Sequence, residues 1–159
     1  MNDTAKLVEH SPLGAELSDE ETRLLAGLMV GRVLDDGDFL IEDGASDDSL
    51  HLVLTGKAEV VKRTGADDFA SLAVIREGEL AGELSFIDGT PHTVGIRALS
   101  DMHVLSLARK DFESIIDSHP QLVYKVMRVV ARSAHRIVHR MNTEFVELSN
   151  YIFKQHGRY

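Results

Sequence analysis

The segment from Gly78 to Thr93 combines the residue types needed to hold an anion that also carries hydroxyl groups. A glycine-punctuated turn leads into a short apolar helix with one acidic residue, Glu83, and a second turn reaches a polar tip at His92. Backbone N–H groups at a glycine turn can bind a phosphate, and a carboxylate accepts hydrogen bonds from sugar hydroxyls. The spacing therefore predicts a site for a sugar phosphate.

Short apolar runs on both sides of this segment must position it. Between residues 33 and 108 such runs recur roughly every 8–12 residues, separated by glycine and aspartate turns. This rhythm predicts an antiparallel sandwich or barrel rather than alternating strands and helices. The predicted strands are residues 39–41, 50–54, 58–61, 72–75, 94–99 and 103–107.

Helices are predicted before and after the strands. Ser18 and Glu21 form a capping box that begins the first helix, and residues 111–117 form a short helix that ends before Pro120. From residue 121 to about 155 neither glycine nor proline interrupts an apolar stripe, so a helix on the order of 50 Å long is expected. Because this helix is longer than the domain, we expect a second copy of the chain to cover part of its stripe and form a homodimer.

The predicted long helix also carries a row of basic residues, Arg128, Arg132, Arg136 and Arg140, at intervals of four. The row is either a solvated face, or it contacts the acidic body, an acidic partner or a second phosphate of a larger ligand. His135 and His139 have the spacing of a metal pair, but no third ligand accompanies them, and no metal site is predicted.

Composition narrows the function classes. The net charge is -9, and residues 121–159 reverse this balance with seven Lys and Arg against two acids. An acidic body disfavours nucleic-acid binding. The chain has no cysteine, no apolar run long enough to span a membrane, no secretory signal and no catalytic constellation. We therefore predict a cytoplasmic protein that is not an enzyme and needs no cofactor.

The segment around Glu83 resembles the phosphate-binding cassette of the cyclic-nucleotide-binding domain of the catabolite activator protein type. Gly82, Glu83 and Leu84 match the G-E-[LI] core of that family, and Pro91 falls just before the tip. The glycine rhythm of residues 33–108 also resembles the family's β-roll, so the resemblance covers nearly the whole chain.

The resemblance implies a mainly β, α+β fold: an antiparallel β-roll or jelly-roll with a short N-terminal helix and a long C-terminal helix. Residues 1–12 would be a flexible tail and residues 13–159 a single domain. Within it, residues 13–32 would be helical, 33–108 the β-roll and 109–156 the C-terminal helices. No helix-turn-helix follows, so a stand-alone module without a DNA-binding domain is expected.

The resemblance also implies a ligand, cAMP or cGMP, and a set of contacts. The expected nucleotide-binding residues are Gly82, Glu83, Leu84, Ser85, His92 and Thr93, and the expected base lid is Arg136 and Ile137. The family's arginine is replaced by His92, and losing a bidentate charged contact could cost about 2–5 kcal/mol. The alternative for Glu83 is a surface or capping carboxylate, and for His92 an exposed turn residue.

Two functions follow from these expectations. In the first, the chain is a regulatory domain in signal transduction that senses a cyclic nucleotide and relays its binding through the C-terminal helix. In the second, the fold has lost the nucleotide and serves as a dimeric scaffold for an unknown protein partner. The intact Gly82–Leu84 core favours the first, whereas His92 and an apolar lid favour the second.

Overall fold

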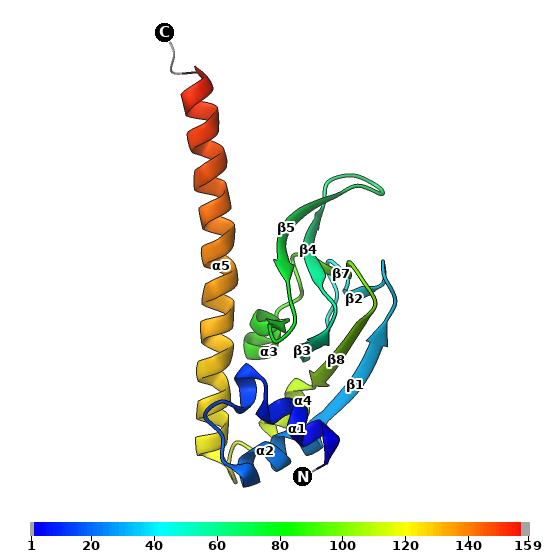
Figure 1. Ribbon diagram of the computed structural model, residues 1–159, viewed down its shortest axis with the longest axis vertical. Helices are drawn as coiled ribbons and strands as arrows, with labels where there is room; N and C mark the ends of the chain where they lie inside the picture. Colours follow the sequence, from blue (N-terminus) through cyan, green and yellow to red (C-terminus); the bar gives the residue numbers. More distant parts are fainter. Residues whose placement is uncertain (1, 157–159) are drawn as a thin grey trace.

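Two four-stranded antiparallel sheets form the centre of the protein (Figure 1). The computed structural model describes residues 2–156, without the side chains of Met141, Gln155 and His156. The first sheet has the strand order β1-β8-β3-β6 and the second β2-β7-β4-β5. The strands are β1 (Met29–Leu34), β2 (Phe39–Ile41), β3 (Leu50–Thr55), β4 (Ala58–Arg63), β5 (Phe69–Ile75), β6 (Leu80–Ala81), β7 (Gly95–Ala98) and β8 (Met102–Leu107).

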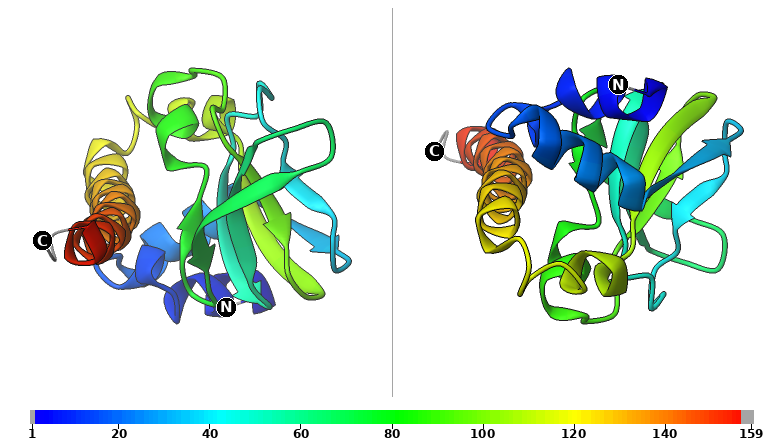
Figure 2. Two further views of the ribbon diagram at one scale, coloured as in Figure 1. Left: turned by 90° about the horizontal axis from the view of Figure 1, so that it is seen from above. Right: turned by 90° about the horizontal axis from the view of Figure 1, so that it is seen from below.

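Helices surround the sheets at one end and along one side. They are α1 (Asp3–Glu9), the 3₁₀ helix η1 (Pro12–Gly14), α2 (Asp19–Leu28), α3 (Glu83–Asp88), α4 (Arg109–Glu113) and α5 (Pro120–His156). Viewed along its axis, α5 stands beside the two sheets and does not pass between them (Figure 2). The predicted mainly β fold with a long C-terminal helix is confirmed.

The N-terminus differs from the sequence expectation. Residues 1–12 were expected to be a flexible tail, but Asp3–Glu9 form α1, which the side chain of Asn2 caps by accepting a hydrogen bond from Ala5 N–H. Ala5 and Val8 are buried against the other helices, and this burial stabilises a helix too short to persist alone. The capping box of Ser18 and Glu21 begins α2 as predicted, but the chain becomes strand β1 within the segment expected to be helical.

Alternation along β3 divides the core into two parts. Leu50 and Leu52 face the helices, where they pack with residues of α1, α2, α4 and α5. Val53 faces the space between the sheets and packs with residues such as Val60 and Ile96. Because successive strand side chains point to opposite faces, one strand supports both parts of the core.

The first half of α5 is held against the rest of the protein by apolar contacts and ion pairs. Leu122, Val126, Val129 and Val130 are buried, which fixes one face of the helix. Lys125 pairs with Glu21 at 2.7 Å, both Arg128 and Arg132 pair with Glu16, and Arg140 pairs with Glu79 at 2.5 Å. Three members of the basic row thus contact acidic residues of the body, one of the alternatives that the sequence left open.

The second half of α5 extends beyond the sheets (Figure 1). Its large apolar side chains are exposed there, including Phe145 at 70% and Phe153 at 73%. Within residues 2–156, none of the helices combines the length and the apolar character that crossing a membrane would require.

Candidate functional site

The chain reverses sharply at Gly82, where β6 ends and α3 begins. Gly82 has φ +82°, in the left-handed region, and a Cβ added to it would lie 2.7 Å from the backbone oxygen of Ser49. Any other residue would carry both a strained backbone and this steric clash. Glycine at this position therefore allows α3 to begin directly against β3 and directs the next residue, Glu83, toward α5.

Glu83 is a buried carboxyl group that joins α3 to α5. Its side chain is 6% exposed, and its Oε1 accepts a hydrogen bond of 2.6 Å from the hydroxyl of Ser133, which is itself buried. Burial raises the pKa of Glu83 because the charged form loses its hydration, and the bond from Ser133 only partly opposes this effect. A carboxyl group has several lone pairs, so one bond from Ser133 leaves capacity for a ligand hydroxyl.

His92 lies at the opposite side of the same cavity, and both of its ring nitrogens face protein atoms. Nε2 contacts the backbone oxygen of Asp47, and Nδ1 lies 3.3 Å from Oγ of Ser85. The Ser85 hydroxyl donates its single proton to the backbone oxygen of Thr90 at 2.6 Å. His92 can therefore donate to both Asp47 and Ser85 only as the doubly protonated imidazolium.

Three polar residues form a hydrogen-bonded chain beneath this site. His51 is fully buried; its Nδ1 lies 2.7 Å from Oγ of Ser106 and its Nε2 3.1 Å from Oδ2 of Asp47. Burial of Asp47 opposes its ionisation, but the hydrogen bonds from His51 and from the N–H of Ser49 outweigh this and hold its pKa well below the usual range. Asp47, which also contacts His92, is thus held in one position.

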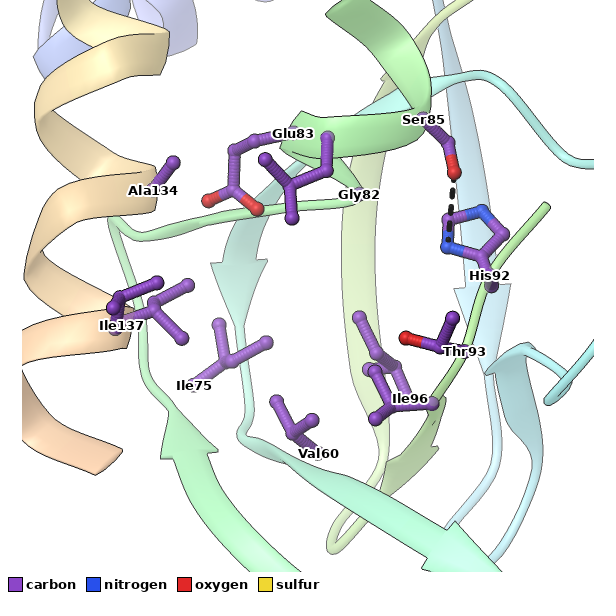
Figure 3. Close-up of a pocket in the computed structure, with 13 residues that line it drawn as sticks. Val60, Ile75, Gly82, Glu83, Ser85, His92, Thr93, Ile96, Ala134 and Ile137 are labelled. Atoms are coloured by element: carbon purple, nitrogen blue, oxygen red, sulfur yellow. Dashed lines mark hydrogen bonds between the residues drawn. The ribbon is translucent and has the colours of Figure 1, made fainter. Parts of the chain in front are cut away.

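A pocket of about 230 Å³ lies between α3, the tip around His92 and the middle of α5 (Figure 3). Its walls are mostly apolar, with side chains of Val60, Ile75, Ile96 and Ile137 facing one another. The polar side chains at its edge are those of Glu83, Ser85, His92 and Thr93. Pockets for drug-sized ligands usually measure about 300–1,000 Å³, so this one encloses part of such a molecule and leaves the rest exposed.

The structure brings most of the predicted site residues together. The lining includes Gly82, Glu83, Leu84, Ser85, His92, Thr93 and Ile137. Leu84 is 63% exposed and lies at the mouth, whereas Arg136 points to solvent and does not line the pocket. Ala134 and Val138 complete the side formed by α5.

Sequence motifs could not identify Ser133, His51 and Asp47 as parts of the site. Ser133 lies 50 residues from Glu83, and His51 lies 55 residues from Ser106. No local spacing signals such pairs, because tertiary packing alone brings them into contact. The signal that existed for Asp47 was its place in an acidic turn, which indicated a loop and no particular partner.

The chemistry available here is binding by hydrogen bonds and apolar contact. Among the residues that the structure describes, no group of three or more His, Cys, Asp or Glu side chains is arranged to hold a metal ion. A buried carboxyl group, two hydroxyls and an imidazole around an apolar pocket suit a ligand with a hydroxylated part and a flat or apolar part.

Comparison with protein families agrees with this geometry. Residues 31–119 match the family model described as "Cyclic nucleotide-binding domain". The match covers the strands from β2 to β8, together with α3, α4 and the pocket residues that lie outside α5.

Individual relatives show the same likeness. The Cyclic AMP receptor protein of Thermus thermophilus is 28% identical over 122 residues, which cover 77% of this chain and 56% of that protein. A crystal structure of the N-terminal domain of a Streptomyces coelicolor transcriptional regulator is 31% identical, with a TM-score of 0.69, covering 82% of this chain and 93% of that one. The structure of the Thermus thermophilus Catabolite Activator Protein is 26% identical, with a TM-score of 0.67, and the match covers 90% of this chain and 64% of that one. The chain thus spans little more than half of the curated relative.

Proposed function

Because the chain belongs to the cyclic nucleotide-binding domain family, we propose that it is a regulatory module that senses a cyclic nucleotide, cAMP or cGMP. The observation that carries the proposal is the buried hydrogen bond between Glu83 and Ser133. This bond connects Glu83, the buried carboxyl group in the pocket lining, to the long C-terminal helix α5. The proposed role is binding and relay, and no catalytic step is part of it.

In the proposed complex, the sugar hydroxyls lie against Glu83, and the phosphate lies toward Ser85, His92 and Thr93. The base lies against Ile137 and the other apolar side chains of the pocket. Support comes from the positions of these residues around one cavity (Figure 3). The base would be held by burial, since the α5 side chains in the lining offer it no hydrogen-bonding group.

The relay would follow from the carboxyl group that the ligand and Ser133 share. A ligand hydroxyl that binds the remaining lone pairs of Glu83 would shift this carboxyl group relative to Ser133, and with it one of the attachments of α5 to the body. The ion pairs of Arg132 with Glu16 and of Arg140 with Glu79 would set how far the helix moves. Binding shifts the position of α5 only to the extent that the ligand prefers one position over the other.

The test is calorimetric titration of the chain with cAMP and cGMP at pH 6 and pH 8. The Glu83→Ala variant should lose binding while circular dichroism shows an intact fold. Glu42→Ala removes an exposed carboxylate outside the pocket and is the matched control, so it should bind as the wild type does. Unchanged affinity in Glu83→Ala would refute the proposal.

A second candidate function is a dimeric scaffold that binds no nucleotide. Two observations favour it: both ring nitrogens of His92 already contact protein atoms, and the second half of α5 exposes Phe145, Leu148 and Phe153. Under either function we propose that a second copy of the chain covers this apolar face. A cytoplasmic location stays a prediction.

The association can be tested by sedimentation velocity. Replacing Phe145 with Asp should turn a dimer into a monomer, because a charged side chain would have to be buried in the shared interface. Asn150→Asp introduces the same charge at an exposed polar position of α5 and serves as the control. A wild-type chain that sediments as a monomer at all concentrations would exclude the homodimer.

A further inference from the structure

The polar side chains of the pocket lining carry no permanent positive charge. Within the part of the chain that the structure describes, no lysine or arginine side chain lines it. Its polar side chains are one carboxyl group, two hydroxyls and the imidazole of His92. A cyclic phosphate carries a permanent negative charge, and without a matching positive charge only N–H donors such as those of the glycine turn can bind it.

Two cations beside the lining, Lys62 and Arg140, have other partners. Nζ of Lys62 donates to the backbone oxygen of Thr93 at 2.5 Å and lies 3.5 Å from a carboxylate oxygen of Asp43. Arg140 is held by Glu79 through both of its terminal nitrogens. Each would have to leave a carboxylate before it could reach a phosphate, and the bond gained would be offset by the bond lost.

His92 is constrained in the same way. Its ring nitrogens contact the backbone oxygen of Asp47 and the hydroxyl of Ser85. Asp47 is fixed in turn by hydrogen bonds with His51 and the N–H of Ser49. A phosphate at the tip would therefore replace existing hydrogen bonds of the histidine instead of filling an empty bonding position.

The opposite end of the pocket suits an uncharged hydroxylated ligand. Glu83 accepts one hydrogen bond from Ser133, and Figure 3 shows its carboxyl oxygens directed toward the space between α3 and α5. A ribose hydroxyl can donate to this group, and a flat base can pack among Ile75, Ile96 and Ile137. Burial also raises the pKa of Glu83, which reflects surroundings that disfavour negative charge.

We infer that the site recognises the ribonucleoside part of its ligand and gains little affinity from the cyclic phosphate. A free ribonucleoside would then bind about as tightly as its 3′,5′-cyclic monophosphate. This inference rests on the proposed function in one respect only, since it assumes that the pocket accepts a nucleotide-like molecule.

The experiment compares dissociation constants of the wild-type chain for adenosine, 2′-deoxyadenosine, cAMP, guanosine and cGMP by calorimetry. It is made at pH 8, above the ordinary titration range of imidazole. We expect adenosine and cAMP, and likewise guanosine and cGMP, to agree within about threefold. The deoxynucleoside should bind about tenfold more weakly than adenosine, because Glu83 then loses a hydroxyl donor.

Each outcome separates this inference from the proposed function. A cyclic nucleotide that binds more than about thirtyfold tighter than its nucleoside would overturn the inference and leave the proposed function intact. Nucleosides that bind while cyclic nucleotides do not would contradict the expected equality of the two affinities and would also refute cyclic-nucleotide sensing. If neither class binds, both fail and the scaffold function stands.

A substitution at the tip gives an independent readout. His92→Arg supplies the permanent charge that the lining lacks, and should shift the ratio of cAMP to adenosine affinity toward cAMP by about tenfold or more. Ser46→Arg adds the same charge at an exposed neighbouring position outside the pocket and should leave the ratio unchanged. If His92→Arg leaves the ratio unchanged, the phosphate does not lie at this tip, and the explanation through the missing cation is overturned.

Discussion

Replacing Ser133 with alanine removes the one side-chain hydrogen bond that Glu83 accepts from α5. Both residues are buried, so the lost hydroxyl leaves little room for water in its place. A hydrogen bond to a charged group contributes about 1.5–3 kcal/mol, and one between neutral groups about 0.5–1.5 kcal/mol. Where the carboxyl group is ionised, the free energy of unfolding should therefore fall by about 1.5–3 kcal/mol, which lowers Tm by about 3–12 °C in a chain of this size.

The stability that Ser133→Ala loses should increase as the pH rises. Burial raises the pKa of Glu83 above its unfolded value, so its contribution to stability is fully present below the unfolded pKa and is lost as pH rises through the folded pKa. The bond from Ser133 lowers the folded pKa, and without it the loss at high pH becomes larger. At pH 4 the carboxyl group is mostly protonated in both states, and only the neutral hydrogen bond, about 1 kcal/mol, should be missing.

The assay is urea unfolding of wild type and Ser133→Ala at pH 4 and pH 8, followed by circular dichroism. Ser149→Ala makes the same chemical change on α5, far along the chain from Glu83, and should stay within about 0.5 kcal/mol of wild type at both values. A variant as stable as wild type at pH 8, or one that loses more stability at pH 4 than at pH 8, would refute the account of the buried carboxyl group.

Three further perturbations test other parts of the site. In urea unfolding, the free energy of unfolding of Gly82→Ala should be at least about 2 kcal/mol below that of wild type, because φ is +82° and the new Cβ would lie 2.7 Å from the backbone oxygen of Ser49. A variant as stable as wild type would contradict this expectation. Asp47→Asn should unfold more easily at pH 7, and the difference should shrink below about pH 4, because the lowered pKa of Asp47, held by His51, contributes stability that acid removes. Arg140→Ala should speed amide hydrogen exchange in the middle of α5, and unchanged exchange would show that its ion pair does not hold the helix.

Much of the fold follows from local sequence patterns. The capping box of Ser18 and Glu21 and the strands at residues 39–41 and 50–54 were predictable, because caps, turn glycines and apolar runs act over a few residues. The long helix was predictable for the same reason. The helix α1 was not, since its seven residues are stabilised by burial of Ala5 and Val8 against distant parts of the chain.

The same division holds for the site. The sequence by itself determined the turn at Gly82 and the position of Glu83 directly after it, because a left-handed turn leading into a short helix is local chemistry. It could not determine that Glu83 is buried against Ser133, or that the ring of His92 already binds Asp47 and Ser85. Asp47 and His92 are 45 residues apart, and Glu83 and Ser133 are 50 residues apart. These contacts arise only when α5 and the loop before β3 pack around α3. Which polar groups remain available to a ligand is therefore decided by tertiary packing, since burial and hydrogen-bond partners are properties of the assembled structure.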